Sequence, residues 1–320
     1  MKLNVLKQAS LPDALTAELA RRYHLVELTA LTDADFRALA GTFTVLITNG
    51  EATVTRELIA SLPALEVIAV FGVGYDGVDV QAAAEHQVRV SHTPGVLTDD
   101  VADLALGLML ATSRRDRRRP QVYRSGRVGG GRFSVDAKVS GSRVGIVGMG
   151  RIGRAIARRC EGFAMQIAYH DRKRLPALNY AWREDLLTPA AESDFLVICT
   201  PGTAANQGLI NQPVLAALGE SGILINISRG SVIDEPALVA ALESGIIAGA
   251  GLDVFSHEPA VPAGLLQRSN VVVTPHMASA TWSTRAAMAQ LVLDNVACWA
   301  EKKALVTPVA GKPGGLTAKP

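Results

Sequence analysis

Three glycines near the middle of the chain have a spacing that points to phosphate binding. The apolar run Val144–Val147 has the composition of a buried strand, and Gly148–Gly153 then reads G-x-G-x-x-G. In dinucleotide-binding folds the first glycine allows a tight turn, the second lets the backbone approach a pyrophosphate, and the third lets a helix pack on the sheet. The N–H groups at the start of that helix attract phosphate oxygens. We therefore expect a dinucleotide at this loop.

The residues that would meet the adenosine ribose give two opposite signals. Asp171 ends the next strand pattern, eighteen residues after Gly153. Its carboxylate would accept a hydrogen bond from a ribose 2′-OH, which favours NAD. The cations Arg172, Lys173 and Arg174 follow at once, and they would pair with a 2′-phosphate, which favours NADP. We favour NADPH as the cofactor and keep NADH as the alternative.

Short β-type runs alternate with helix-sized segments on both sides of this loop. In the first hundred residues the runs are 3–7, 24–28, 44–48, 65–72 and 88–92. A second series comprises 143–148, 165–170, 194–200, 222–228, 249–255 and 270–275. Such alternation is typical of parallel sheets with helices on their faces.

The length of the chain predicts two domains. At roughly 100–200 residues per domain, 320 residues exceed one ordinary core. We expect residues 1–100 and 283–320 to form a substrate-binding (catalytic) domain, and residues 101–282 to form a dinucleotide-binding domain inserted in it. Thr98 is a good N-cap, and Asp99 and Asp100 suit the positive end of a helix dipole, so a helix should begin there.

The composition indicates a globular protein, and its small net charge gives no strong electrostatic field that would attract nucleic acid or a membrane. Hydrophobic residues make up 48%, charged residues 19%, and the net charge is +2. The arginines between Arg114 and Arg119 suit the end of a helix, and no aromatic residues are interleaved with them. Cys160, Cys199 and Cys298 show no C-x-x-C spacing. We expect reduced thiols in a cytoplasmic protein, with no disulfide frame and no metal site.

Several motifs, in order along the chain, resemble those of the D-isomer-specific 2-hydroxyacid dehydrogenase family. They read FGVGYDGVD (71–79), TPGVLTDDVADLALGLML (93–110), INISRGSVIDEPALVAAL (225–242), GAGLDVFSHEP (249–259) and VTPHMASAT (273–281). The resemblance spans about residues 71–288 and is greatest to the glyoxylate/hydroxypyruvate reductase branch. It implies an α/β protein with two doubly wound parallel-sheet domains, a Rossmann dinucleotide-binding domain inserted in a flavodoxin-like substrate domain.

The resemblance also implies roles for individual residues. Arg229 would bind the substrate carboxylate and keto oxygen, His276 would be the general acid, and Glu258 would be the partner of His276. The backbone N–H groups of Val73 and Gly74 would bind the substrate carboxylate. The residues expected at the cofactor are Thr98, Gly148, Gly150, Arg151, Ile152, Gly153, Asp171, Arg172, Lys173, Arg174, Thr200, Pro201, Ile227, Asp253, His276 and Ala278.

The chemistry of keto-acid reduction asks for the same residue types. It needs a hydride donor, a proton donor and a cation for the carboxylate. A histidine can donate a proton near neutral pH, and an adjacent carboxylate favours its charged form. An arginine fork grips a carboxylate through two bonds. Structural roles remain open from sequence alone: Arg229 and Asp253 could form an ion pair, Glu258 could start a helix, and His276 could cap a loop.

These observations predict an NADPH-dependent reductase that converts small 2-keto acids, such as glyoxylate and hydroxypyruvate, to D-2-hydroxy acids. Two alternatives are an NAD-dependent dehydrogenase of a larger D-2-hydroxy acid and a dinucleotide-sensing corepressor that binds protein partners. A homodimer is expected, formed through the Gly-rich segment Arg127–Phe133 and the apolar helix Val101–Leu110. Trp282 and Arg285 lie at the start of the last helix, and the sequence leaves their role open.

Overall fold

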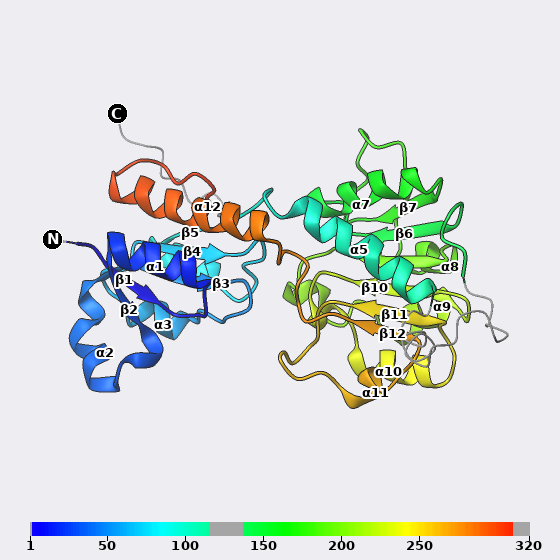
Figure 1. Ribbon diagram of the computed structural model, residues 1–320, viewed down its shortest axis with the longest axis horizontal. Helices are drawn as coiled ribbons and strands as arrows, with labels where there is room; N and C mark the ends of the chain where they lie inside the picture. Colours follow the sequence, from blue (N-terminus) through cyan, green and yellow to red (C-terminus); the bar gives the residue numbers. More distant parts are fainter. Residues whose placement is uncertain (1, 115–136, 310–320) are drawn as a thin grey trace, which may run out of the picture. The chain divides into compact units, whose positions relative to one another are not determined.

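The computed structural model describes residues 2–114 and 137–309, which form two compact units. The first unit contains the described residues up to Leu97 and those from Thr281 onward, and the second runs from Thr98 to Ala280. Figure 1 shows how α12 (Trp282–Ala300) brings the chain back to the first unit. The Gly-rich segment Arg127–Phe133 and the arginines beyond Arg114 lie outside the described residues. Which unit binds substrate and which binds the dinucleotide stays a prediction at this point.

The first unit contains a parallel sheet of five strands in the order β2-β1-β3-β4-β5. The strands are β1 (Asn4–Lys7), β2 (His24–Glu27), β3 (Phe43–Asn49), β4 (Val67–Phe71) and β5 (Arg89–Ser91). Every residue of β4 is buried, as expected for an inner strand with helices on both faces. The strand order is that of flavodoxin-like folds, which confirms the predicted fold of this unit.

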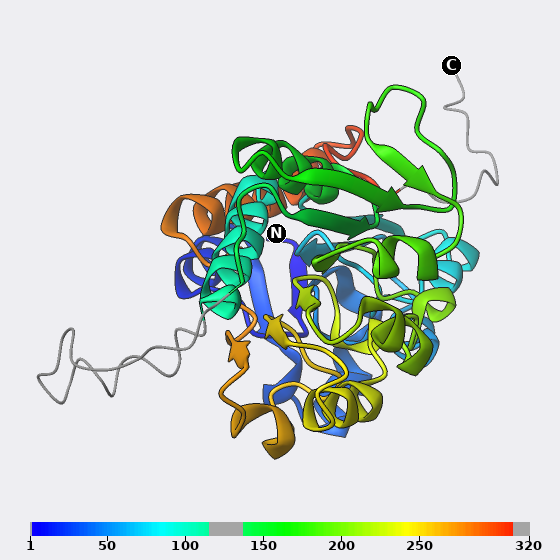
Figure 2. The ribbon, with the colours of Figure 1, turned by 90° about the vertical axis from the view of Figure 1, so that its right-hand side faces the viewer.

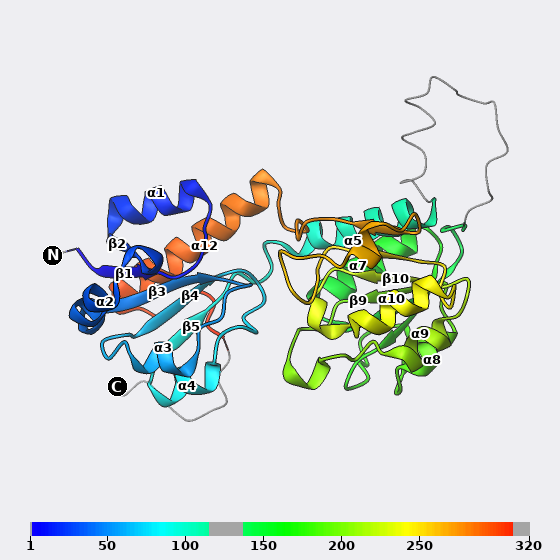
Figure 3. The same ribbon diagram turned by 90° about the horizontal axis from the view of Figure 1, so that it is seen from below.

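Helices cover both faces of this sheet. They are α1 (Asp13–Arg22), α2 (Asp33–Leu39), α3 (Arg56–Ala60), α4 (Val80–Glu85) and α12. Figure 3 shows α1 and α12 on one face and α3 and α4 on the other. Thr32, Thr55 and Asp79 are N-caps whose side chains accept a hydrogen bond from the N–H three residues later. Each cap satisfies a donor that the first helical turn leaves unpaired.

The second unit contains a parallel sheet of seven strands in the order β12-β11-β10-β9-β6-β7-β8. The strands are β6 (Arg143–Val147), β7 (Gln166–His170), β8 (Ala181–Arg183), β9 (Phe195–Ile198), β10 (Ile223–Asn226), β11 (Gly249–Leu252) and β12 (Val271–Val273). The chain moves outward in both directions from β6 and β9, which is Rossmann topology and confirms the prediction. Figure 2 shows β8 and β12 at opposite edges. The sequence pattern did not indicate β8, because three residues are too few to show an alternation.

The helices of the second unit form a layer on each face. They are α5 (Thr98–Ser113), α7 (Arg151–Gly162), α8 (Leu187–Ala191), α9 (Gln212–Leu218), α10 (Glu235–Glu243) and α11 (Ala263–Leu266). In Figure 3, α5 and α7 lie on one side of the sheet and α8, α9 and α10 on the other. Arg159 of α7 joins the two helices of the first layer by pairing with Asp99 and Asp103. No helix in the ranges 2–114 and 137–309 combines the length and apolar character needed to cross a membrane.

The expected N-cap of α5 requires a correction. Thr98 is already the first helical residue, because the chain enters α5 from a turn at Val96 and Leu97. Asp99 and Asp100 lie in the first turn as expected. Helix ends commonly differ by a residue or two from sequence estimates.

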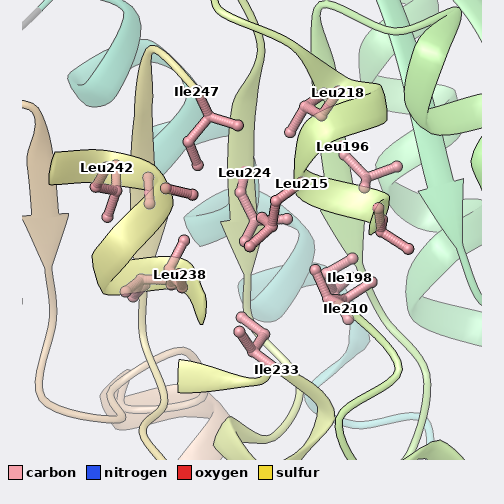
Figure 4. Close-up of a cluster of buried hydrophobic side chains, with 14 of the residues drawn as sticks. Leu196, Ile198, Ile210, Leu215, Leu218, Leu224, Ile233, Leu238, Leu242 and Ile247 are labelled. Atoms are coloured by element: carbon pink, nitrogen blue, oxygen red, sulfur yellow. The ribbon is translucent and has the colours of Figure 1, made fainter. Parts of the chain in front are cut away.

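A fully apolar cluster fixes the strands of the second sheet. Leu196 and Ile198 of β9 and Leu224 of β10 are completely buried, and they pack against Leu215 of α9 and Leu238 of α10 (Figure 4). Strands buried on both faces read as continuous apolar runs, which is why the sequence revealed β9 and β10 so clearly. This packing fixes the strand ends from which the site residues extend.

Candidate active site

The strands of the second sheet end at one common edge, where the expected cofactor residues follow them. Val147 of β6 pairs with His170 of β7 and Ile198 of β9, and Asn226 of β10 pairs with Ile198 and Leu252. The residues that come next are therefore neighbours along the edge: Gly148, Asp171, Cys199, Ile227 and Asp253. Ligands of open α/β sheets bind at this edge, where the strand order reverses, which here is between β6 and β9.

Each glycine of the fingerprint has its own structural reason. Gly148 has φ +95°, and a Cβ there would lie 2.9 Å from the amide nitrogen of Thr200. A Cβ on Gly153 would lie 2.2 Å from the carbonyl oxygen of Gly148, so α7 can pack this closely only with glycine. In the part of the chain that the structure describes, a Cβ on Gly150 would meet nothing within 4 Å. The space beside Gly150, directly before the N–H groups of α7, fits the pyrophosphate of a dinucleotide.

The carboxylate of Asp171 is already bound to the backbone of this loop. One oxygen accepts a hydrogen bond from Met149 N at 2.9 Å, and the other accepts from Arg172 N at 2.7 Å. Asp171 therefore ties the end of β7 to the glycine loop, and this structural role is the same for NAD and for NADP. The side chains of Arg172, Lys173 and Arg174 are exposed beyond it. A carboxylate with both oxygens engaged is a weaker argument for NAD than the sequence suggested, and the cations remain available to a 2′-phosphate.

A second loop lies against the glycine loop, after β9. Asn206 holds it by donating hydrogen bonds to Thr200 Oγ1 at 3.0 Å and to the carbonyl oxygen of Pro201 at 2.9 Å. Thr200 touches the position of Gly148, as the glycine geometry shows. The expected neighbourhood of Thr200, Pro201 and the glycine loop is therefore present. Asn206 was not predicted, because nothing in its local sequence distinguishes it from a loop asparagine.

Arg229 extends from a loop that is organised by a buried asparagine. Asn226 ends β10 and is fully buried. Its Oδ1 accepts hydrogen bonds from the N–H and the hydroxyl of Ser228, both at 3.0 Å, and its Nδ2 donates to the carbonyl oxygen of Arg229 at 3.0 Å. Arg229 Nη1 donates to the carbonyl oxygen of Ser228 at 2.7 Å. A polar residue at the end of a buried apolar strand must find such partners, and this signal could have revealed Asn226.

Two glycines allow a close approach between the Arg229 loop and neighbouring loops of the same chain. A Cβ on Gly202 would lie 2.8 Å from Cγ of Arg229, so the stem of the arginine packs on the loop after β9. A Cβ on Gly230 would lie 1.9 Å from the carbonyl carbon of Phe255, in the loop after β11. Real Cβ atoms do not come so close, so both positions require glycine. The guanidinium therefore extends from a stem that is held between two strand-end loops.

Asp253 holds the turn that carries His276. It is fully buried, and its carboxylate accepts hydrogen bonds from the hydroxyl of Thr274 at 2.6 Å, from Met277 N at 2.9 Å and from Ala278 N at 3.0 Å. The N–H of His276 donates to the carbonyl oxygen of Asp253 at 2.9 Å. A buried carboxylate with three donors is a rigid anchor. The expected place of Asp253 at the cofactor stays a prediction.

His276 and Glu258 form a close pair. Nδ1 of His276 lies 2.7 Å from Oε2 of Glu258, and both side chains are 27% exposed. The other carboxylate oxygen, Oε1, accepts a hydrogen bond from Phe255 N at 2.9 Å. His276 has φ +50°, a left-handed conformation that costs energy for a residue with a side chain. The Asp253 contacts stabilise this conformation, and the Glu258 bond fixes the orientation of the ring.

The surroundings of Glu258 favour its charged form. Burial alone would raise its pKa, but the hydrogen bond to His276 and the N–H of Phe255 lower it, with further help from the charge of Arg229. The net result is a pKa below the ordinary value for glutamate. Because Nδ1 is engaged by a carboxylate, the protonated ring presents Nε2 as a proton donor. This arrangement can supply a proton to a developing alkoxide.

The first unit carries the loop expected to bind the substrate carboxylate. Val73 and Gly74 follow β4 after the single residue Gly72, and within the described residues their N–H groups have no hydrogen-bond partner. Nδ1 of His92 lies 2.8 Å from the carbonyl oxygen of Val73, and Thr93 N donates to the carbonyl oxygen of Gly72 at 2.8 Å. The loop is thus held through its carbonyl groups while two N–H groups remain available.

Comparison with known proteins identifies the family. The sequence model of the D-isomer specific 2-hydroxyacid dehydrogenase NAD binding domain matches residues 106–278, more than half of the chain. The chain belongs to this family. It is an NAD(P)-dependent 2-hydroxyacid dehydrogenase, and the matched region lies within the second unit.

Relatives of this dehydrogenase match it over nearly its whole length. Hydroxyphenylpyruvate reductase of Plectranthus scutellarioides is 44% identical over 309 residues, covering 96% of this chain and 99% of that protein. Glyoxylate/hydroxypyruvate reductase A of Arabidopsis thaliana is 40% identical over 309 residues, which cover 96% of this chain and 99% of that protein. An NADPH-dependent glyoxylate/hydroxypyruvate reductase from Sinorhizobium meliloti, solved with NADP and malonate, superposes with a TM-score of 0.90 at 42% identity, covering 97% of each chain.

The second unit of this 2-hydroxyacid dehydrogenase assembles most of the predicted site. Arg229, Glu258 and His276 extend from loops that share one sheet edge, and Glu258 and His276 are in contact. Arg151 and Ile152 form the first turn of α7, Thr98 begins α5, and Ile227 and Ala278 are nearly buried. Glu235 of α10 was not predicted: it accepts a hydrogen bond from Ser256 N at 3.0 Å and so supports the loop that carries Glu258. Individual cofactor and substrate contacts stay predictions.

Proposed function

We propose that this enzyme reduces small 2-keto acids, with glyoxylate and hydroxypyruvate as the preferred substrates, to D-2-hydroxy acids with NADPH as the electron donor. The observation that carries the proposal is the His276–Glu258 pair on the turn anchored by Asp253. A charged imidazole held in this way is a proton donor for a keto oxygen, and general acid catalysis typically contributes about 10²–10⁴-fold.

The residues divide the reaction between them. Hydride for the keto carbon comes from the reduced nicotinamide. His276 gives the proton at Nε2 to the keto oxygen as the carbon is reduced, and Glu258 stabilises the imidazolium until that transfer. Arg229 binds the carboxylate and polarises the keto oxygen with its fork of N–H donors. Val73 and Gly74 bind the carboxylate through their backbone N–H groups.

Substrate choice can be tested by comparing kcat/KM for three keto acids. Glyoxylate and hydroxypyruvate are favoured because six relatives that are more than 37% identical are named as reductases of one or both of these acids. The name of the Plectranthus relative supports 4-hydroxyphenylpyruvate as a second candidate. We expect the two small acids to give the higher kcat/KM. A higher value for 4-hydroxyphenylpyruvate would reverse this order, and no turnover of any of the three would favour a dinucleotide-sensing role.

The cofactor preference rests on Arg172. Arg172→Ala is expected to weaken NADPH binding roughly 10- to 100-fold and to leave NADH binding almost unchanged, because only NADPH carries the 2′-phosphate. A hydrogen bond to a charged group contributes about 1.5–3 kcal/mol. Fluorescence titration of wild type and variant with both cofactors measures this difference.

Arg158→Ala is the matched control, since it removes an exposed arginine from α7 of the same unit. It should leave both affinities as they are in the wild type. Equal losses for NADPH and NADH in Arg172→Ala would show that Arg172 does not recognise the 2′-phosphate.

We also propose a cytoplasmic homodimer. On α5, Leu110 keeps 39% of its surface accessible and Gly107 is exposed, so the helix offers a partner one apolar side chain beside a position without a side chain. The three cysteines are free thiols, which suits a reducing compartment. Analytical sedimentation at micromolar concentration is expected to give twice the 33.7 kDa of one chain. A single species at the monomer mass would contradict the dimer.

A further inference from the structure

Arg285 is a half-buried arginine in the first unit, and no polar group among the described residues pairs with its guanidinium. It lies in the first turn of α12, and its guanidinium carbon is 5.5 Å from the ring centroid of Phe71, the last residue of β4. In residues 2–114 and 137–309, no hydrogen bond or ion pair to its guanidinium is present. Burial lowers the pKa of Arg285 from its ordinary value, while the charge of Glu51 acts in the opposite direction.

A cation in this position loses hydration without gaining a hydrogen bond. Burying a charge is costly unless it is paired and hydrogen-bonded. The face of an aromatic ring compensates for part of that cost, since an arginine stacks on it favourably. Among the described residues, however, no protein group accepts a hydrogen bond from the five N–H donors of the guanidinium. A group with these properties is suited to binding an anion that arrives from solution.

The donors that could share such an anion belong to the neighbouring loop. Phe71 is followed at once by the loop that contains Val73 and Gly74, whose N–H groups are also without a partner in the described part of the chain. A Cβ on Gly72 would lie 3.2 Å from Gly50, so this loop packs tightly on the loop after β3. Both loops lie at the carboxyl ends of the strands, the edge where sheets of this topology bind ligands.

We propose that Arg285 is a substrate-binding residue, which together with the N–H groups of Val73 and Gly74 forms a carboxylate-binding half-site contained entirely in the first unit. This inference rests on the proposed function, because it assigns the substrate carboxylate to that half-site. The guanidinium offers two parallel N–H donors to a carboxylate, and the backbone N–H groups complete its coordination. Arg229 of the second unit is then left to act mainly on the keto oxygen.

A structural role is the alternative for Arg285, since its stacking on Phe71 also packs α12 against β4. The two roles predict different kinetics. A carboxylate contact is made in the ground state and in the transition state, so its loss raises KM more than it lowers kcat. A loss of packing would instead lower the thermal stability and reduce the activity, with no specific weakening of carboxylate binding.

The test measures binding of oxamate, an unreactive monocarboxylate analogue, to the NADPH-saturated protein by calorimetry. Arg285→Gln is expected to weaken oxamate about 10- to 100-fold and to raise KM for glyoxylate by a similar factor, with NADPH affinity unchanged. Arg285→Lys, which keeps the charge but not the fork, should fall between Arg285→Gln and wild type. Arg37→Gln is the matched control, because Arg37 is an exposed arginine of α2 in the same unit.

The outcomes separate this inference from the proposed function. Loss of oxamate binding in Arg285→Gln supports the half-site even if glyoxylate proves not to be turned over. Unchanged oxamate affinity in Arg285→Gln overturns the half-site even if glyoxylate is a good substrate. No oxamate binding by the wild type, or equal weakening in Arg37→Gln, also overturns it.

Discussion

Replacing His276 with alanine is expected to lower kcat for glyoxylate reduction by at least about 100-fold, while the Kd for NADPH stays within about twofold of the wild type. The imidazole is the only group of the His276–Glu258 pair that can deliver a proton at neutral pH, because the surroundings of Glu258 keep it a carboxylate. Without it, the developing alkoxide must be protonated by water. Single-turnover kinetics with bound NADPH, followed at 340 nm (about the nicotinamide absorption maximum), isolate this chemical step.

His257→Ala provides the matched control for this variant. His257 lies one residue before Glu258, is exposed to solvent, and belongs to the same loop. It should retain wild-type kcat, so a loss confined to His276→Ala shows that the effect is specific to His276 and does not follow from the removal of a neighbouring imidazole. If His276→Ala retained most of the activity, another group would be the proton donor.

The parts of the site that the sequence predicted are those whose residue types have a local cause. The turn at Gly148 needs a positive φ, and the contact of Gly153 with Gly148 leaves no room for a side chain. Both constraints lie within six residues, so the spacing alone reveals them. The continuous apolar runs of β9 and β10 were equally clear, because strands buried on both faces consist mainly of apolar residues.

The support of the catalytic residues depends on distant contacts and could not be predicted in the same way. Asp253 reaches the turn of His276 across more than twenty residues of sequence, and its hydrogen bonds stabilise the left-handed backbone of His276. Sequence spacing contains no record of such a bond. Glu235 illustrates the same limit, since it supports the loop of Glu258 through a hydrogen bond from Ser256 N, a partner that lies 21 residues away and is set by the fold.

Asp171 shows how tertiary structure changes the meaning of a motif residue. Its place after β7 indicated ribose recognition and hence NAD. In the structure both carboxylate oxygens accept backbone N–H groups, so an aspartate at this position also has a structural reason to be there. An acidic residue and a cluster of cations can therefore occur together in an NADPH site without contradiction.

Glu258→Gln is expected to move the falling limb of the pH–rate profile for reduction to lower pH. Reduction requires protonated His276, so the rate falls as pH rises through the apparent pKa of the pair. The wild-type carboxylate, which stays charged because its own pKa is below the ordinary value, favours the imidazolium and keeps the enzyme active to higher pH. Glutamine retains a hydrogen-bonding group but removes the charge, so the imidazolium loses its proton earlier.

The same substitution makes a second prediction for the reverse reaction. Oxidation of D-glycerate requires neutral His276 as the base, so its rate rises with pH through the same apparent pKa, and this rising limb should also move to lower pH. The variant should lose less of its reduction rate at acidic pH than at alkaline pH, because loss of the imidazolium limits reduction only as the pH rises. Profiles of kcat/KM in both directions, measured with wild type and Glu258→Gln, provide the comparison. Limbs that stay in place would show that the charge of Glu258 does not control His276, and the 2.7 Å contact would then serve only to orient the ring.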